Sequence, residues 1–383
     1  MADRRIYLDY NATSPVRPSA ASAVMRAMSL PGNASSVHNE GRAARALVET
    51  GRDQVASLVG ARARNVYFTS GGTEANNTVL SPGLHIGAAK EPAAVLVVSA
   101  TEHPSVLAGH RFPAEQVRVL PVRNNGIVDL EALEALLEDA GGRAVVSIHL
   151  ANNETGIIQP IRAAAEIVHR HGGVMHTDAV QAAGRLALDI ADLGVDVMTV
   201  SSHKIGGPKG AGAIILGSAS VDLGGALIRG GGQERGNRSG TENVISIAGF
   251  GAAAEDARAE LTSGLPGIEA LRRSMEKIIL DSVPDAVIIG KDTDRLANTL
   301  AVAFPGQRAE TLLIVFDLAG VALSSGSACS SGKVKRSHVL DAMGMDRSLA
   351  EGAVRISLGW DTDEQDTAFF ALACQTVFKG LYR

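Results

Sequence analysis

Short apolar runs alternate with longer amphipathic segments over the first two thirds of the chain. Between the runs, apolar residues recur at three- and four-residue spacing, as at 130–138 and 163–171, which predicts helices. The runs themselves are rich in Val, Ile and Leu and predict strands at 65–69, 94–99, 117–122, 144–150, 174–177, 197–201 and 213–216. Because this alternation is typical of βαβ units, the sequence predicts an α/β fold with a mostly parallel seven-stranded sheet between helices.

The pattern changes after Thr241. A helical pattern at 244–261 leads into the breaker-rich segment TSGLPG. The rest mixes helical patterns with strands predicted at 287–289, 299–304, 321–324 and 353–357, as in an α+β domain. We therefore predict a large domain of residues 15–260 and a small domain of residues 1–14 and 261–383, which contains Cys329 and Arg355.

The composition is that of a globular protein, with 45% hydrophobic and 20% charged residues in a chain of 383. The 36 Lys and Arg residues are spread along the chain and the formal net charge is −5, so neither nucleic acid nor an anionic membrane is indicated as a partner. No apolar run has the roughly 18 residues of a membrane span, and the first residues lack a signal-peptide pattern. We expect a cytoplasmic protein that acts on a small molecule.

The chain has two cysteines, which excludes a disulfide framework or a four-cysteine metal site. Cys374 lies in the apolar helical pattern DTAFFALACQTVF, where a buried and inert thiol is expected. Cys329 lies in SSGSACSSGK, a small, polar segment that predicts a surface loop. A reactive thiol is therefore expected at Cys329.

Polar residues follow several predicted strands, at the edge where open α/β sheets bind ligands. In SGGTEANN, glycines precede Thr73 at a helix start, which favours a phosphate, although an ordinary helix cap explains the same pattern. His103 follows the next strand, and Asn152 and Asn153 follow a third, where a structural role or a turn is the alternative. These positions predict a polar site at one edge of the sheet.

Two charged residues at strand ends indicate more specific chemistry. Asp178 ends a buried strand, where a carboxylate needs a cation or several donors, and a protonated pyridine nitrogen would serve. Gln181 follows three residues later. Lys204, in SSHKIGGPKGAG, follows another interior strand, and a partly desolvated lysine loses its proton readily and can attack a carbonyl group.

Two other chemistries are disfavoured. GGPKGAG lacks the Walker arrangement of Lys followed by Ser or Thr, so the sequence does not predict an ATP site. The histidines His169, His171 and His176 suggest a metal site, but the first two are two residues apart near a helix end and do not share a face. We expect no metal site.

Ten segments distributed over nearly the whole chain carry a resemblance to a known family. They are YLDYNATSP, GNASSVH, FTSGGTEANN, EHPSV, NNETGIIQPI, HTDAVQAAGR, SSHKIGGPKGAGA, GGGQERGNRSGTEN, SSGSACSSG and VRISLG. In this order they resemble the cysteine desulfurases of the NifS/IscS type, in the class V aminotransferase group of fold type I pyridoxal 5'-phosphate enzymes. The resemblance implies an aspartate aminotransferase-like fold and pyridoxal 5'-phosphate as the cofactor.

The resemblance also implies residue roles. Lys204 would bind the cofactor covalently and move the substrate proton, Asp178 would pair with the pyridine nitrogen, and His103 would stack on the ring and assist proton transfer. Arg355 would bind the substrate carboxylate, and Thr241 would reach the phosphate of the neighbouring subunit in a homodimer. Asn153 and Gln181 would form hydrogen bonds near the phenolic oxygen, and Asn153 would also contact the substrate. The phosphate would be held by Gly72, Thr73, Ser201 and His203.

In the implied reaction the Cys329 thiolate takes sulfur from L-cysteine as a persulfide, and L-alanine is released. The Gly- and Ser-rich segment is suited to carry the thiol to a sulfur acceptor or an iron–sulfur scaffold protein, and it resembles the longer loop of the IscS/NifS branch. A transient role of Cys329 as an iron–sulfur ligand is part of the same resemblance. Basic residues follow the cysteine, and the segment after Cys374 is shorter than the tail by which IscS-type enzymes are thought to dock a scaffold.

Three alternatives stay open at this point. A selenocysteine lyase or a class V aminotransferase would share the fold and cofactor, but an aminotransferase needs no cysteine in a mobile loop. A non-enzymatic sulfur carrier would also retain the fold. The presence of Asp178, Lys204, Cys329 and Arg355 together favours an enzyme.

Overall fold

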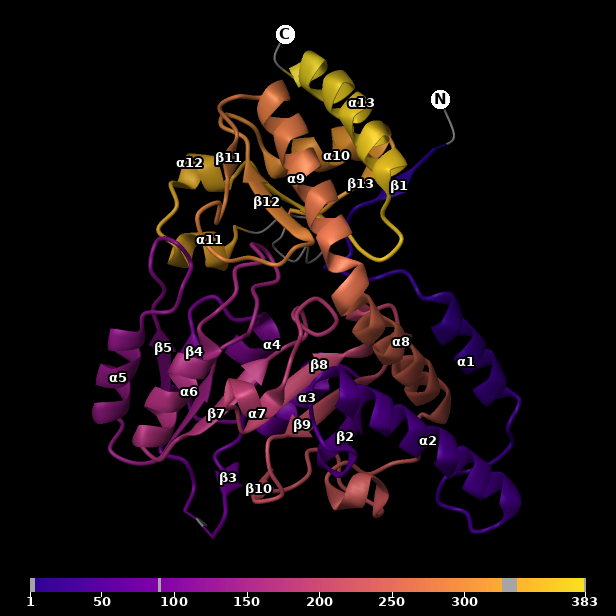
Figure 1. The fold of residues 1–383 in the computed structure, drawn as a ribbon. Helices are drawn as coiled ribbons and strands as arrows, with labels where there is room; N and C mark the ends of the chain where they lie inside the picture. Colours follow the sequence, from indigo (N-terminus) through magenta and orange to yellow (C-terminus); the bar gives the residue numbers. More distant parts are fainter. Residues whose placement is uncertain (1–3, 89–90, 326–335, 382–383) are drawn as a thin grey trace.

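The computed structural model describes residues 4–88, 91–325 and 336–381 (Figure 1). Its central element is a seven-stranded sheet with the order β2-β9-β8-β7-β6-β4-β5. The strands are β2 (Val66–Thr69), β4 (Val95–Ser99), β5 (Val117–Leu120), β6 (Ala144–Ser147), β7 (Val174–Asp178), β8 (Val197–Ser201) and β9 (Gly212–Leu216). Only β9 runs antiparallel to its neighbours, so the predicted mostly parallel seven-stranded sheet is confirmed.

Helices cover both faces of this sheet because successive side chains of a strand point to opposite faces. In β4, Val95 and Val97 join one hydrophobic cluster, while Leu96 and Val98 join the other. The first cluster includes residues of α2 (Asn39–Leu58), α5 (Leu130–Glu138), α6 (Ile161–Arg170) and α8 (Val244–Ser263). The second includes residues of α3 (Gly72–Val79) and α4 (Pro104–Leu107). The sheet is therefore the middle of three layers.

A second, smaller sheet lies above the first in Figure 1 and has the antiparallel order β11 (Val287–Ile288), β12 (Thr299–Ala303), β14 (Ala353–Ser357). Next to it, β1 (Ile6–Tyr7) pairs in parallel with β13 (Val321–Ala322). A separate hydrophobic cluster joins these strands to α9 (Leu265–Ser282), α10 (Ala309–Leu318) and α13 (Glu364–Leu381). Cys374 lies fully buried in this cluster, as predicted.

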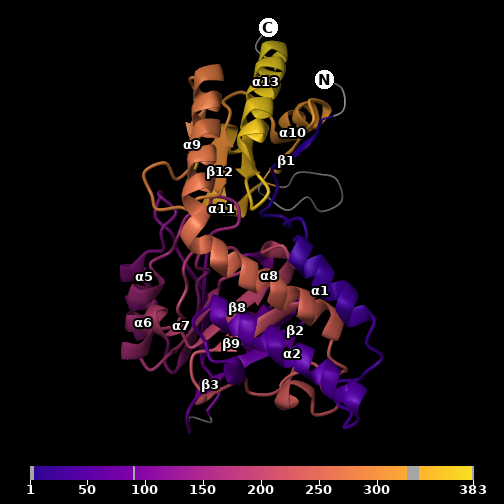
Figure 2. The ribbon, with the colours of Figure 1, turned by 45° about the vertical axis from the view of Figure 1, so that its right-hand side comes forward.

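Figure 2 shows α8 along the lower layers and α9 rising from its end beside α13. The two helices meet at Gly264, and Pro266 lies in the first turn of α9. The separate cores on either side of this break support the proposed division near residue 260, with residues 1–14 assigned to the small domain.

One longer helix, α1 (Pro18–Met28), lies between β1 and α2 in the chain. The remaining helices and strands are short: β3 (His85–Ile86), α7 (Ile190–Leu193), β10 (Val221–Asp222), α11 (His338–Ala342) and α12 (Arg347–Ala350). The largest difference from a predicted strand is at β6, which ends at Ser147 rather than at residue 150, although Ile148 and Leu150 still donate backbone hydrogen bonds to the neighbouring strand β7. None of the helices in the described ranges has the length and hydropathy that crossing a bilayer requires.

Candidate active site

The carboxyl ends of β4, β7 and β8 lie at one edge of the large sheet, where the small sheet faces it. Asp178 is the last residue of β7, Lys204 ends a short turn after β8, and His103 follows β4. Arg355 lies in the middle of β14 and enters from the small sheet. The predicted catalytic residues in the described part of the chain thus converge on the space between the two sheets.

Lys204 has the side chain with the clearest chemical signal. Its Nζ donates to the backbone carbonyl oxygens of Asn11 and, at 3.0 Å, of Ala12. Burial, together with the charges of Arg355 and Arg185, lowers the pKa of Lys204 to about 7 against the opposing effect of Asp178. A large fraction of this amine is therefore unprotonated near neutral pH and can attack a carbonyl carbon.

Asp178 is 7% exposed, and both of its oxygens accept a hydrogen bond from the protein. Its Oδ2 accepts from Asn76 Nδ2 at 2.7 Å, and its Oδ1 accepts from the backbone N–H of Val180 at 2.9 Å. Its negative charge raises the pKa of both His103 and Lys204. The carboxylate is held by neutral donors and keeps its charge available for a cationic ligand.

His103 caps the N-terminus of α4. Its Nδ1 accepts from the backbone N–H of Ser105 at 3.1 Å and lies 2.8 Å from Ser105 Oγ. Partial desolvation and the charge of Lys204 lower the pKa of His103, against the opposing charge of Asp178. The ring is thus neutral at neutral pH, in keeping with a side chain that covers a flat ligand.

The start of α3 forms a corner suited to an anion. No side chain caps this helix, and a Cβ atom at Gly72 would lie 2.9 Å from Val180 Cγ2, so a larger residue would crowd the turn. Beside it, the buried hydroxyl of Ser201 has no hydrogen-bond partner among the described residues. Thr73 is exposed at the same helix start. Free backbone N–H groups and an unsatisfied hydroxyl are what a phosphate group requires.

His203 lies next to this corner. Its Nδ1 is 3.2 Å from Thr13 Oγ1, and burial lowers its pKa to about 4 with the nearby charge of Lys204 contributing. The ring is therefore neutral, and it could bind an anion as a hydrogen-bond donor and not as a cation.

Arg355 is 4% exposed and has a carboxylate partner that the sequence did not reveal. Its Nη2 donates to Asp9 Oδ1 at 2.6 Å, and its Nη1 donates to the backbone oxygen of Asn153 at 2.8 Å. Its Nε is buried and has no partner in the described ranges. The guanidinium is held in place and retains a donor for a carboxylate ligand.

Gln181 is joined to a second unpredicted residue, Arg185. Gln181 Oε1 accepts from Arg185 Nη1, and Gln181 Nε2 donates to the backbone oxygen of Asn11 at 3.0 Å. Arg185 has no acidic partner in the described part of the chain, and burial lowers its pKa to about 9. Its position four residues after Gln181 was the available signal, because i and i+4 side chains meet in a helical turn.

Two predicted residues are not placed at this site. Thr241 is exposed, and no described hydrogen bond joins it to the other predicted site residues. Cys329 lies outside the described residues. The described residues on either side of its segment adjoin the site: Ser324 pairs with the backbone of Arg355, and Ser337 Oγ donates to Glu154 at 2.5 Å.

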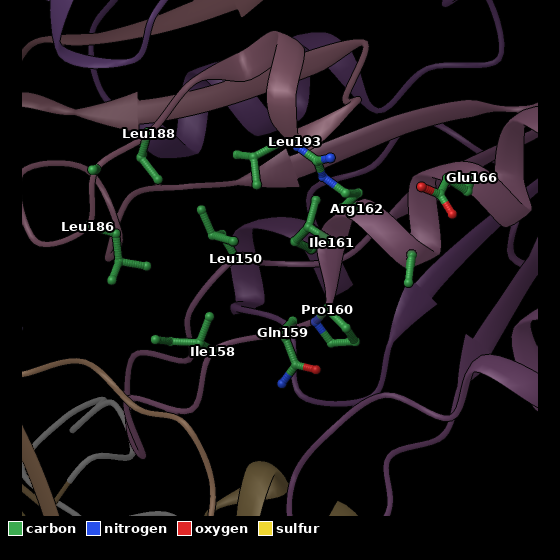
Figure 3. A pocket seen from close by; sticks show the side chains of 12 residues that line it. Leu150, Ile158, Gln159, Pro160, Ile161, Arg162, Glu166, Leu186, Leu188 and Leu193 are labelled. Carbon is green, nitrogen blue, oxygen red and sulfur yellow. The ribbon is translucent and has the colours of Figure 1, made fainter.

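A pocket of about 490 Å³ adjoins Lys204 near the junction of α8 and α9, and Tyr10, Arg17, Arg185 and Trp360 are among its lining residues. A second depression, of about 650 Å³, lies elsewhere on the large domain (Figure 3). It is mostly aliphatic and contains none of the predicted site residues, with Gln159, Arg162 and Glu166 as its polar members. Neither depression is lined by His103, Asp178 or Arg355, so the site is defined by the contacts of these side chains with their neighbours.

Two of the histidines that suggested a metal site have separate carboxylate partners in the structure. His169 Nε2 is 2.9 Å from Asp196, and His171 Nε2 is 2.8 Å from Glu134, so each of them pairs with a separate carboxylate. In the described ranges, no group of three or more His, Cys, Asp or Glu side chains could hold an ion.

Comparison with known proteins gives one consistent result. The family model described as class V aminotransferase matches residues 6–370. The chain is 41% identical over 365 residues to a cysteine desulfurase of Cereibacter sphaeroides, which covers 94% of this chain and 92% of the relative. It is 36% identical over 391 residues to the cysteine desulfurase IscS of Dictyoglomus turgidum, covering 99% and 95%. An X-ray structure of a NifS-like protein from Rickettsia africae has a TM-score of 0.89 at 35% identity, covering 98% of this chain and 100% of that one.

Proposed function

The chain belongs to the class V aminotransferase family, and from this premise we propose that it is a cysteine desulfurase. It converts L-cysteine to L-alanine and receives the sulfur on Cys329 as a persulfide. The sulfur then passes to an acceptor in iron–sulfur cluster or other sulfur-cofactor assembly. Relatives that are named cysteine desulfurases and match more than nine tenths of this chain support the proposal.

Enzymes of this family use pyridoxal 5'-phosphate, and the residues of the site fit this group. The unsatisfied Ser201 hydroxyl and the uncapped start of α3 suit its phosphate, and the Lys204 amine suits its aldehyde. We propose that it is held by Lys204, Asp178, His103, Gln181, Asn153, Gly72, Thr73, Ser201 and His203. When bound, the cofactor supplies an electron-withdrawing ring that stabilises negative charge at the substrate Cα.

The side chains of the protein bind the substrate and move its proton. Arg355 binds the carboxylate of L-cysteine through its unpaired Nε and an adjacent Nη. Lys204, with a pKa of about 7, accepts the Cα proton on Nζ and returns it later in the cycle. Asp178 supplies the negative charge that keeps a pyridine nitrogen protonated.

The sulfur transfer balances without an outside oxidant or reductant. The Cys329 thiolate attacks the substrate sulfur, so that an S–S bond forms and the bond between Cβ and sulfur breaks. The electron pair of the broken bond remains on the substrate carbon skeleton, which takes up protons and leaves as L-alanine. The product on the protein is one persulfide on Cys329.

One observation supports this proposal more strongly than the other observations do. A lysine with a strongly lowered pKa shares its surroundings with the Asp178 carboxylate and with an arginine that has an unpaired buried donor. These are the three groups that an amino acid bound to pyridoxal phosphate requires: an amine to exchange, a partner for the ring nitrogen and a clamp for the carboxylate.

The test is mass spectrometry of the cofactor-loaded protein after treatment with L-cysteine. We expect one added sulfur on Cys329 and an equal amount of L-alanine. Cys329→Ser should retain the coloured bound cofactor and lose sulfide release, whereas Cys374→Ala, which alters the fully buried thiol, should desulfurate normally. Normal desulfuration by Cys329→Ser would contradict the persulfide mechanism.

The finer assignments belong to the same proposal. We propose a homodimer in which Thr241 of one subunit reaches the phosphate of the other, in keeping with its exposure in the single chain. We also propose a cytoplasmic location and a protein sulfur acceptor.

A further inference from the structure

A fully buried carboxamide connects two sides of the site. Asn76 lies in α3 with 0% exposure, and each of its side-chain polar atoms has a partner. Its Nδ2 donates to Asp178 Oδ2 at 2.7 Å and to Ser105 Oγ at 2.9 Å. Its Oδ1 accepts from Thr199 Oγ1 at 2.6 Å. Both donor hydrogens of the amide are therefore used, one on the Asp178 side and one on the His103 side.

The partners determine the orientation of this amide. If the Asn76 side chain were flipped, its oxygen would face the Asp178 carboxylate at a hydrogen-bond distance, with no hydrogen between two acceptors. In the observed orientation, Thr199 donates and Asp178 accepts, so every atom of the group is satisfied. The carboxamide has one stable arrangement in this site.

The same chain of bonds determines the tautomer of His103. The backbone N–H of Ser105 donates to Nδ1 at 3.1 Å, and a backbone N–H can act only as a donor. Because Ser105 Oγ accepts from Asn76, its own hydrogen is free to go to Nδ1, 2.8 Å away. Nδ1 is therefore an acceptor, and the proton of the neutral ring lies on Nε2.

We propose that Asn76 is a positioning residue that orients the Asp178 carboxylate and, through Ser105, holds His103 neutral with its proton on Nε2. The inference rests on the proposed function only for the roles of Asp178 and His103. The hydrogen-bond geometry itself does not depend on that function.

The charges around His103 agree with this arrangement. Partial desolvation and the charges of Lys204 and His338 lower the pKa of His103, while Asp178 and Glu102 raise it. A protonated ring would place an Nδ1 hydrogen against the N–H of Ser105, which adds a cost to the charged form. Removing Asn76 should reduce this cost, because the Ser105 hydroxyl could then turn and accept from Nδ1.

The test uses ¹⁵N NMR of the full-length, cofactor-free protein with ¹⁵N-labelled histidine, and a His103 substitution assigns its signals. In the unmodified protein we expect the neutral His103 ring to carry its proton on Nε2. In Asn76→Ala and in Ser105→Ala, the pKa of His103 should rise by roughly half to one unit, the value of one lost hydrogen bond.

The neighbouring asparagine provides a matched control. Asn77 lies on the same helix and donates to the backbone oxygens of Thr73 and Ser105 at 2.8 and 3.2 Å, without contact to Asp178 or to the Ser105 hydroxyl. Asn77→Ala should leave the pKa of His103 unchanged. Ser105→Thr, which retains the hydroxyl, should also retain the unmodified value. If Asn76→Ala does not fold, the comparison of Ser105→Ala with Ser105→Thr carries the test.

Two outcomes overturn the inference: a neutral His103 with its proton on Nδ1, or an unchanged pKa of His103 in both Asn76→Ala and Ser105→Ala. These results are independent of the proposed function, because no cofactor or substrate is present. A lack of persulfide on Cys329 would contradict the proposed function and would leave the NMR result unaffected.

Discussion

Two groups of ionisable side chains face each other across the site, and they differ in how many of their polar atoms have hydrogen-bond partners. The large-domain rim consists of His103, Asp178 and Lys204, in which His103 Nδ1, both Asp178 oxygens and the Lys204 amine already have protein partners. The small-domain rim consists of Arg355 with its partner Asp9, and it keeps the buried Nε of Arg355 unpaired. We infer that the first rim is prepared for a permanently bound group and the second for a ligand that comes and goes.

The two rims also differ in how the fold supports them. Residues of the large-domain rim follow parallel strands of a sheet that is covered on both faces, so their backbones are fixed before any ligand binds. Arg355 lies in the three-stranded sheet, where its backbone pairs with Ser324, and its side chain is oriented by an ion pair. Substitutions in the first rim should therefore affect the chemical step, and substitutions in the second should affect substrate affinity.

The largest effect is expected for Lys204→Ala. This change removes both the covalent link to the cofactor and the group that moves the Cα proton, so the turnover number should fall by at least about 10²- to 10⁴-fold. The measurement is alanine production from L-cysteine, together with borohydride reduction and peptide mapping of the bound cofactor. A reducible adduct on another lysine would show that the large-domain rim has been assigned wrongly.

The pH dependence of cofactor binding tests the same rim without turnover. The pKa of Lys204 is lowered to about 7, whereas an ordinary lysine titrates near 10.5. The attacking amine is neutral above its pKa, so the rate of cofactor uptake should rise with pH and level off above about 7. At pH 7 the neutral fraction of the Lys204 amine should exceed that of an ordinary lysine by about three orders of magnitude, and the rate of cofactor uptake should be higher accordingly. A rate that continues to rise up to pH 10 would contradict the lowered pKa.

The same pKa has a defined effect on the stability of the cofactor-free chain. Between about 7 and 10.5 the unfolded chain binds the Lys204 proton and the folded chain does not. The contribution of this residue to the free energy of unfolding therefore increases with pH across that window. Below about pH 7 both states are protonated, and the full cost of the buried charge is present.

Much of this comparison could be predicted from the sequence, because the large-domain rim has local signals. Asp178 ends a buried apolar run and Lys204 follows the next one, so strand periodicity alone placed both at one edge of the sheet. Asp9 could not be found in this way. It becomes a partner of Arg355 only because β1 crosses to pair with β13, a contact between residues more than 300 positions apart.

Asn76 shows a second limit. Its sequence context, TEANN, is that of an ordinary first turn of a helix, and nothing in it distinguishes the buried Asn76 from the partly exposed Asn77. The difference arises from the rotation of α3 against β7 and β8, which turns one amide toward Asp178 and Thr199. Helix phase relative to a sheet is a tertiary property, so the hydrogen-bond network beneath the site required the structure.

A smaller effect is expected for Arg355→Lys, which probes the small-domain rim. Lysine keeps the charge but loses the planar donors that bind a carboxylate in a bidentate manner. The KM for L-cysteine should rise by about 10- to 100-fold, which corresponds to one hydrogen bond to a charged group, while kcat changes less. Arg272→Lys is the control, because Arg272 is equally buried but pairs with Glu276 away from the site. A loss confined to kcat would mean that Arg355 acts in the chemical step.

The smallest effect, and the sharpest comparison of the two rims, is expected for Asp9→Asn measured against Asp178→Asn. Both carboxylates raise the pKa of Lys204, and Asp178 does so more strongly than Asp9. Removing either negative charge should therefore move the midpoint of cofactor uptake to a lower pH, by less than about one unit for Asp9, which lies in the partly solvated rim. The shift should be larger for Asp178→Asn, because that carboxylate belongs to the same rim as the amine. Equal shifts would mean that the two rims form one electrostatic unit, and the division between a fixed cofactor side and an exchangeable substrate side would then have no basis in charge.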